Sequence, residues 1–153
     1  MVIINTVLGL LLTLICLTMQ TAVSFWGVRY YIEHTARADE RGRRHPGFVP
    51  LLATTSAMML ACLVQISLWA GLFLLLGQFD RFYDAVYHSA VNFATLGYGD
   101  IVMKAEWKLL GPLEAINGSM MLGMIAAALM AMLQHMIKAA LAARPPRPRS
   151  RGG

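Results

Sequence analysis

Charged side chains are scarce in this sequence and are missing altogether from long stretches of it. Only 14% of the 153 residues are charged, whereas 58% are hydrophobic. Residues 2–26 and 48–79 contain no charged side chain, and residues 109–137 contain only Glu114. Each stretch is longer than the ~20 apolar residues that a helix needs to cross a bilayer. The composition therefore excludes an ordinary soluble domain and predicts three membrane-spanning helices.

Signatures of catalysis, of metal binding and of voltage sensing are also missing. The sequence has no phosphate-binding Gly-Lys loop, no paired zinc-ligand spacing and no nucleophile motif, so we expect neither an enzyme nor a cofactor. The two cysteines, Cys16 and Cys62, fall within apolar stretches, where a thiol behaves as a small hydrophobic group. The first span carries no arginine series, so we expect only weak voltage dependence.

The first apolar stretch differs from a signal peptide. No basic residues precede it, its core is longer than the usual ~7–15 residues, and no clear small-residue cleavage site follows it. We therefore expect it to remain as a membrane span. Residues 80–94 are too short and too polar to be a fourth span, because a helix of that length covers only ~22 Å. They are expected to form a helix that enters the membrane partway.

Basic residues are concentrated after the first and third spans. Between the second and third spans there are only Arg81, Lys104 and Lys108. Because Lys and Arg near span ends resist translocation, the amino terminus is expected outside and the carboxyl terminus in the cytoplasm. The overall basic charge then reflects membrane orientation and not nucleic-acid binding. The basic residues on the cytoplasmic side are Arg29, Arg37, Arg41, Arg43, Arg44, Lys138, Arg144, Arg147, Arg149 and Arg151.

The run TLGYGD at residues 95–100 places Gly97 and Gly99 on either side of one aromatic residue. Successive carbonyls of an extended strand point in alternating directions. They can all point to the same side if some residues adopt left-handed backbone angles. Glycine adopts these angles at little cost. In a soluble protein such a run is more often a surface turn, so the surrounding sequence decides between the two interpretations.

The run resembles the selectivity filter of potassium channels, in which carbonyl oxygens replace the hydration shell of the ion. Residues 83–95 resemble the pore helix of that family, and residues 113–118 resemble the inner helix of bacterial three-span members. The resemblance covers residues 48–138. It implies an all-α membrane protein with a re-entrant pore helix, four identical subunits around one pore, and passive K⁺ conduction across a cell membrane, with a bacterial inner membrane expected. The ion-binding residues that it implies are Thr95, Leu96, Gly97, Tyr98 and Gly99, with K⁺ held by the first four.

The resemblance also assigns a role to each part of the chain. An extra amino-terminal membrane helix (1–27) and a cytoplasmic linker (28–47) are expected before the pore domain. The first span is expected outside the pore-forming pair, facing lipid or a neighbouring subunit. We expect Asp80 to cap the pore helix and the tail to lie near anionic lipid. The remaining segments are the outer helix (48–79), the pore helix (80–94), the filter (95–100), the inner helix (108–142) and a disordered basic tail (143–153).

The surroundings of the filter depart from the family pattern at three positions. Leu96 replaces the usual Val or Ile, and Ala94 stands where many relatives have a second Thr. Val91 occupies the place of a Glu that holds the Asp after the filter in some relatives, so Asp100 needs another partner. Tyr87 and His88 are the nearest aromatic candidates on the pore helix, and Tyr87 is favoured. The neighbouring His88 is either a packing residue, which we favour, or a pH sensor.

Three further groups of residues are candidates for support and gating. Glu114 is the one acidic residue inside a span, and it is expected to support the filter or the pore helix. Gly118 and Gly123 are candidates for a hinge or for close helix packing, with neither role favoured. Met130, Gln134 and Lys138 lie at helical spacing, with small residues between them, and are candidates for the inner mouth of the pore.

Three alternatives to a potassium channel remain. The substitutions around the filter are compatible with a weakly selective cation channel. Six methionines and His135 suggest, less strongly, a soft-metal binder such as a Cu(I) protein. The third alternative is a membrane scaffold that conducts nothing. The methionines are Met120, Met121, Met124, Met130, Met132 and Met136.

Overall fold

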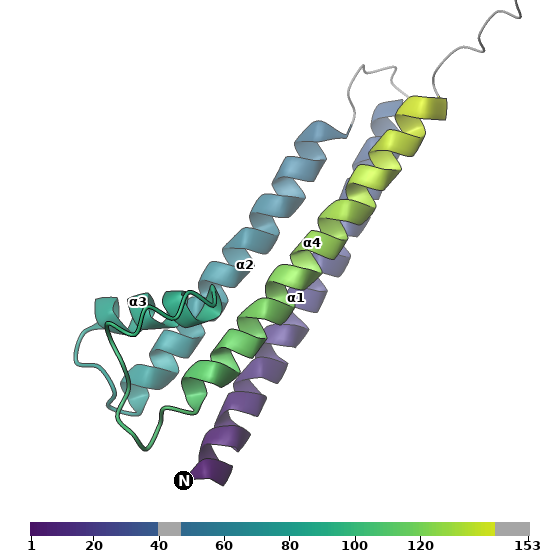
Figure 1. Cartoon of the computed structure of the whole chain (residues 1–153). Coiled ribbons are helices and arrows are strands. Elements are labelled where there is room, and N and C mark those ends of the chain that lie inside the picture. Colours follow the sequence, from purple (N-terminus) through teal and green to yellow (C-terminus); the bar gives the residue numbers. More distant parts are fainter. Residues whose placement is uncertain (40–46, 143–153) are drawn as a thin grey trace, which may run out of the picture.

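The computed structural model describes residues 1–39 and 47–142, and within these ranges all regular structure is helical. Three long helices run side by side, and a fourth, short helix packs against two of them near one end of the bundle and projects to one side (Figure 1). The three long helices are apolar enough to cross a membrane, which confirms the three predicted spans and the all-α fold. The helices are α1 (Val2–Asp39), α2 (Phe48–Leu75), α3 (Phe82–Phe93) and α4 (Leu110–Ala142).

Helix α1 packs against both α2 and α4 of its own chain. Its buried residues recur at intervals of four, seven and eleven and therefore lie on one face of the helix. Two glycines on this face allow close approach: a Cβ at Gly9 would lie 2.6 Å from Leu113 of α4, and a Cβ at Gly27 would lie 2.6 Å from Thr54 of α2. The first span was expected to face lipid or a neighbouring subunit, and the structure adds that one of its faces is covered within the chain. The buried residues of this face include Asn5, Cys16, Gln20, Tyr31 and Thr35.

Polar contacts join α1 to the rest of the chain at both ends and in the middle. Such hydrogen bonds between membrane helices contribute on the order of 0.6–2 kcal/mol each. They fix the position of α1 along the other two helices. The contacts run from Asn5 Nδ2 to Glu106 O (2.7 Å), from Gln65 Nε2 to Gln20 Oε1 (2.9 Å), from Thr54 Oγ1 to Gly27 O (3.1 Å) and from Tyr31 OH to Met132 O (3.1 Å).

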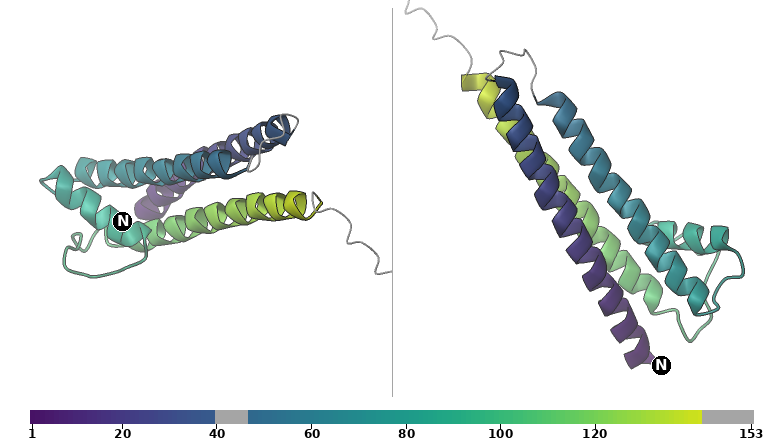
Figure 2. Two further views of the ribbon diagram at one scale, coloured as in Figure 1. Left: turned by 90° about the horizontal axis from the view of Figure 1, so that it is seen from above. Right: turned by 180° about the vertical axis from the view of Figure 1, so that it is seen from behind.

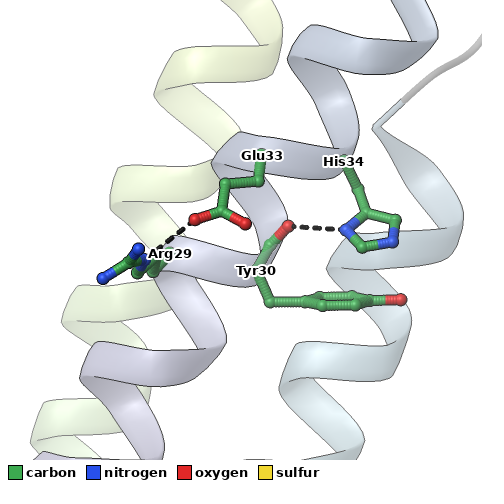
Figure 3. A network of polar contacts seen from close by, with 4 residues as sticks. All are labelled: Arg29, Tyr30, Glu33 and His34. Atoms are coloured by element: carbon green, nitrogen blue, oxygen red, sulfur yellow. Dashed lines mark hydrogen bonds and ion pairs between the residues drawn. The ribbon is translucent and has the colours of Figure 1, made fainter.

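The first helix is longer than the sequence analysis predicted. Residues 28–39, expected to begin a linker, continue α1 without interruption. Two features explain this extension. Tyr31 and Thr35 are buried, and Arg29 Nε donates to Glu33 Oε1 over 2.8 Å, one helical turn away (Figure 3). Residues 28–39 of the expected linker are therefore helical, and Gly47 at its other end caps α2. Residues 40–46 lie outside the described residues, as does the expected tail.

Helix α3 lies at the end of the bundle where α1 and α4 begin, in each of the views of Figures 1 and 2. Its amino-terminal cap is Arg81, without a side-chain hydrogen bond, so the expected cap by Asp80 is wrong. Asp84 lies in the first turn instead, where a negative charge complements the helix dipole. The predicted bounds of the pore helix (80–94), the outer helix (48–79) and the inner helix (108–142) differ from the observed ones by at most four residues.

Candidate functional site

The backbone of residues 95–100 has left-handed angles at every second residue. The φ values are 58° at Thr95, 62° at Gly97 and 71° at Gly99. This alternation is the pattern that turns successive carbonyls to one side of a strand. Thr95 is the one non-glycine residue with positive φ in the described residues. Sequence reasoning identified the two glycines and missed the backbone role of Thr95, although its spacing from Gly97 is the same as that between the glycines.

The left-handed angle of Thr95 follows from the way α3 ends. The amide of Leu96 donates to Val91 O over 2.9 Å, and the amide of Thr95 donates to Asn92 O over 2.8 Å. This pair of hydrogen bonds is a Schellman motif, which places a left-handed residue directly after the helix cap. The end of α3 thus determines that the left-handed angles fall on Thr95 and then on every second residue, at Gly97 and Gly99. It also directs the negative end of the helix dipole to the start of the run.

Nothing else in the described chain covers this run. All residues from 95 to 100 are exposed, and a Cβ at Gly97 or Gly99 would meet no atom within 4 Å. Glycine is therefore required there by the backbone angle and not by lack of space. The side chains of Leu96 and Tyr98 are 54% and 65% exposed.

Tyr87 and Asp100 are joined by a hydrogen bond. Tyr87 OH donates to Asp100 Oδ2 over 2.7 Å, and the amide of Ile101 donates to Asp100 Oδ1 over 3.1 Å. The hydrogen bond from Tyr87 lowers the pKa of Asp100, and the same bond raises the pKa of Tyr87. This is the contact that the sequence favoured, and it ties the end of the run to α3.

A second set of contacts connects α3 to Glu114. Glu114 is fully buried; Ser89 contacts its Oε1 atom, and Asn92 Nδ2 donates to its Oε2 atom over 3.2 Å. Asn92 Nδ2 also lies 3.0 Å from His88 Nε2, and His88 Nδ1 lies 2.9 Å from Ile101 O. Burial lowers the pKa of His88. The sequence analysis named Glu114 and missed Ser89 and Asn92, although their spacing of three places both on one face of a helix.

The two hinge candidates of α4 have different surroundings. A Cβ at Gly118 would overlap the backbone carbonyl oxygen of Phe93, so this glycine lets α4 touch the end of α3. Gly123 is exposed, and a Cβ there would meet no atom within 4 Å. The structure therefore gives Gly118 a packing role and gives Gly123 no contact within the chain.

The candidates for the inner mouth lie together on one exposed face of α4. Met130, Gln134 and Lys138 are exposed, as are Gly123, Ala127 and Ala131 on the same face. The opposite face packs against α1, α2 and α3. Its fully buried residues are Leu110, Glu114, Asn117, Met121 and Met132, the last at 1% exposure.

The methionines of α4 do not converge on one point. Met121 is buried with Cys62 and Phe93, whereas Met120 and Met130 are exposed. His135 packs edge to face on Tyr31. Among the described residues no three His, Cys, Asp or Glu side chains come together as metal ligands. The geometry offers no support for the soft-metal alternative.

The family model described as "Ion channel" matches residues 59–135, half of the chain. The match includes most of α2, all of α3, the run at 95–100 and α4 as far as His135. The chain belongs to this ion channel family. It is a multi-pass membrane protein of a family whose members are generally oligomeric transport proteins. Comparisons with curated proteins and with solved structures gave no match.

Proposed function

We propose that this ion channel conducts K⁺ selectively through a filter formed by residues 95–100. The observation that carries the proposal is the left-handed backbone at every second residue of the run, directly after the end of α3. A K⁺ ion entering the filter exchanges its water for carbonyl oxygens, and neighbouring ions drive one another through. The carbonyls assigned to the ion are those of Thr95, Leu96, Gly97 and Tyr98, with Gly99 completing the ribbon.

Four copies of the chain form the pore in this proposal. One run supplies oxygens from one side only, and an ion needs them on all sides, so the runs meet around a fourfold axis. Two exposed surfaces support this assembly: the run itself and the exposed face of α4. In the tetramer, Met130, Gln134 and Lys138 line the inner mouth, and Gly123 is the hinge of the inner helix. Both surfaces are open in the single chain.

The proposed orientation places the filter at the outer face of the membrane. The amino terminus is then outside and the carboxyl terminus is in the cytoplasm, as the distribution of basic residues favours. The membrane is proposed to be a bacterial inner membrane. The basic tail at 143–153, which lies outside the described residues, is proposed to contact anionic lipid.

Potassium flux into proteoliposomes, compared with sodium flux, tests the proposal through two glycine variants. Gly97→Ala is expected to abolish selective K⁺ flux, because alanine is strained at a φ of 62°. Gly71→Ala is the matched control, since Gly71 lies within α2 and a Cβ there also meets no atom within 4 Å. We expect Gly71→Ala to retain the parent flux.

Other outcomes of this flux measurement distinguish the alternatives. Equal sodium and potassium flux in the parent protein would make the pore a weakly selective cation channel. No flux of either ion from an assembled tetramer would support a scaffold. Full K⁺ selectivity in Gly97→Ala would show that the backbone alternation is not needed, and the proposal would fail.

A further inference from the structure

Five side-chain contacts form a continuous network that joins α2, α3, α4 and the loop after the filter, here called the support network. Its members are Ile66 O, Ser89, Glu114, Asn92, His88 and Ile101 O. It reaches both ends of residues 95–100. Asn92 O accepts the amide of Thr95 at the start, and His88 contacts Ile101 O just after the end.

The contacts of His88 fix its protonation state. Ile101 O can only accept a hydrogen bond, so His88 Nδ1 carries a proton. In the amide orientation in which Asn92 Nδ2 faces the ring, the amide nitrogen can only donate, so His88 Nε2 carries none and accepts. The imidazole is therefore neutral. Asn92 uses both of its N–H groups, one toward His88 and one toward Glu114 Oε2.

The contacts of Ser89 favour a proton on Glu114. Ser89 Oγ lies 2.8 Å from Ile66 O and also contacts Glu114 Oε1, but a hydroxyl has only one hydrogen. If Ser89 gave that hydrogen to a carboxylate, Oγ and Ile66 O would lie in contact with no hydrogen between them. Both contacts are satisfied when Ser89 donates to Ile66 O and accepts from a protonated Glu114. Glu114 is fully buried, and no cation pairs with it in the described part of the chain.

We propose that Glu114 acts as a neutral carboxylic acid. In this proposal Glu114, Asn92 and His88 are positioning residues that hold the two ends of the filter through hydrogen bonds in which each donor and each acceptor is fixed. Glu114 donates to Ser89 and accepts from Asn92. Asn92 in turn orients His88 toward Ile101 O. The effect on ion selectivity rests on the proposed channel function, whereas the protonation state does not.

Glutamine at position 114 is the variant that separates a neutral acid from a charged one. Its amide donates to Ser89 and its oxygen accepts from Asn92, so Glu114→Gln preserves every contact of the support network. Glu114→Leu has a similar size and preserves neither contact. We expect Glu114→Gln to keep the parent ratio of potassium to sodium flux and Glu114→Leu to lose it. Ser89→Ala, a smaller change, is expected to lower the ratio if Glu114→Leu fails to assemble.

Infrared spectroscopy of the purified, lipid-embedded protein tests the proton directly. The parent is expected to show the C=O stretch of a protonated carboxylic acid at neutral pH. This band is expected to disappear in Glu114→Gln and to persist in Glu33→Gln, a matched control at an exposed, ion-paired glutamate. Absence of the band in the parent, or its persistence in Glu114→Gln, would overturn the neutral acid.

The two measurements fail independently. If the band behaves as expected but the parent carries no selective flux, the proposed function fails and the neutral acid stands. If the parent is selective and assembled Glu114→Leu and Ser89→Ala remain as selective, the positioning role fails. Loss of selectivity in Glu114→Gln would show that the charge of Glu114 is what matters, and that result also overturns the inference.

Discussion

At the scale of single residues, the left-handed angle of Thr95 decides how the proposed filter begins. A β-branched residue rarely adopts positive φ, and here the two hydrogen bonds that end α3 hold it there. The sequence revealed Gly97 and Gly99 because glycine marks positive φ by its identity. It did not reveal Thr95, because a threonine gives no such sign until the helix end is known. With Val91 unable to hold Asp100, the sequence left Tyr87 and His88 as candidate partners and favoured Tyr87, which is the residue that donates to Asp100.

His88 makes the support network sensitive to acid. Its neutral form accepts from Asn92, so protonation places two N–H groups face to face. Burial lowers the pKa of His88 below its ordinary value of ~6.5. The network is therefore complete at neutral pH and is lost as the pH falls through that lowered pKa. The groups facing the ring are Asp100, whose charge opposes the shift, Glu114 through Asn92, and the apolar rings of Phe73 and Phe79.

The expected result is a loss of potassium selectivity on acidification of the filter side. The loss should occur below pH ~6.5, the ordinary value for histidine. Bi-ionic recordings at stepped pH measure it. His34→Gln is the control, because His34 is an exposed histidine on α1 and its removal should leave the pH profile unchanged. A selectivity that stays constant down to the pH at which the tetramer dissociates would contradict the role of His88.

At the scale of elements, the contact between α3 and α4 positions residues 95–100, and Gly118 makes this contact possible. The sequence predicted both α3 and α4, because a long uncharged run and a short, more polar segment can be recognised from the order of the residues alone. It could not distinguish the roles of Gly118 and Gly123, since that depends on which glycine faces Phe93. The same limit applied to α1. Its charged carboxyl-terminal part looked like a linker until the burial of Tyr31 and Thr35 showed that this part also packs.

Gly118→Ala is expected to destabilise the protein, and Gly123→Ala is not. The new methyl group at position 118 overlaps the backbone of Phe93, and overpacking of this kind costs roughly 1–3 kcal/mol. Thermal melting of the detergent-solubilised tetramer measures the difference. Gly123→Ala should melt as the parent does and, if Gly123 is the hinge, should reduce open probability in single-channel records. Equal melting temperatures for the parent and Gly118→Ala would show that α3 and α4 are not in close contact.

At the scale of the whole molecule, α1 is part of the same packed unit as α2 and α4. It contacts the loop that follows residue 100 through Asn5 and the carboxyl-terminal half of α4 through Tyr31. Residues 2–28 of α1 carry no charge. One charge crossing 100 mV contributes about 2.3 kcal/mol, so a helix without charges gives the field little to act on. We therefore expect open probability to change little between −100 and +100 mV, as single-channel recordings can measure. Steep voltage dependence would require gating charges elsewhere.

The central claim is that four copies of residues 95–100 surround a dehydrated K⁺ ion. The most direct measurement is the reversal potential of the purified protein in a planar bilayer with K⁺ on one side and Na⁺ on the other. The account predicts a reversal potential far from zero. Its sign should make the K⁺ side negative, because K⁺ is the ion that crosses the bilayer. A reversal potential near zero, with current carried equally by both ions, would contradict it.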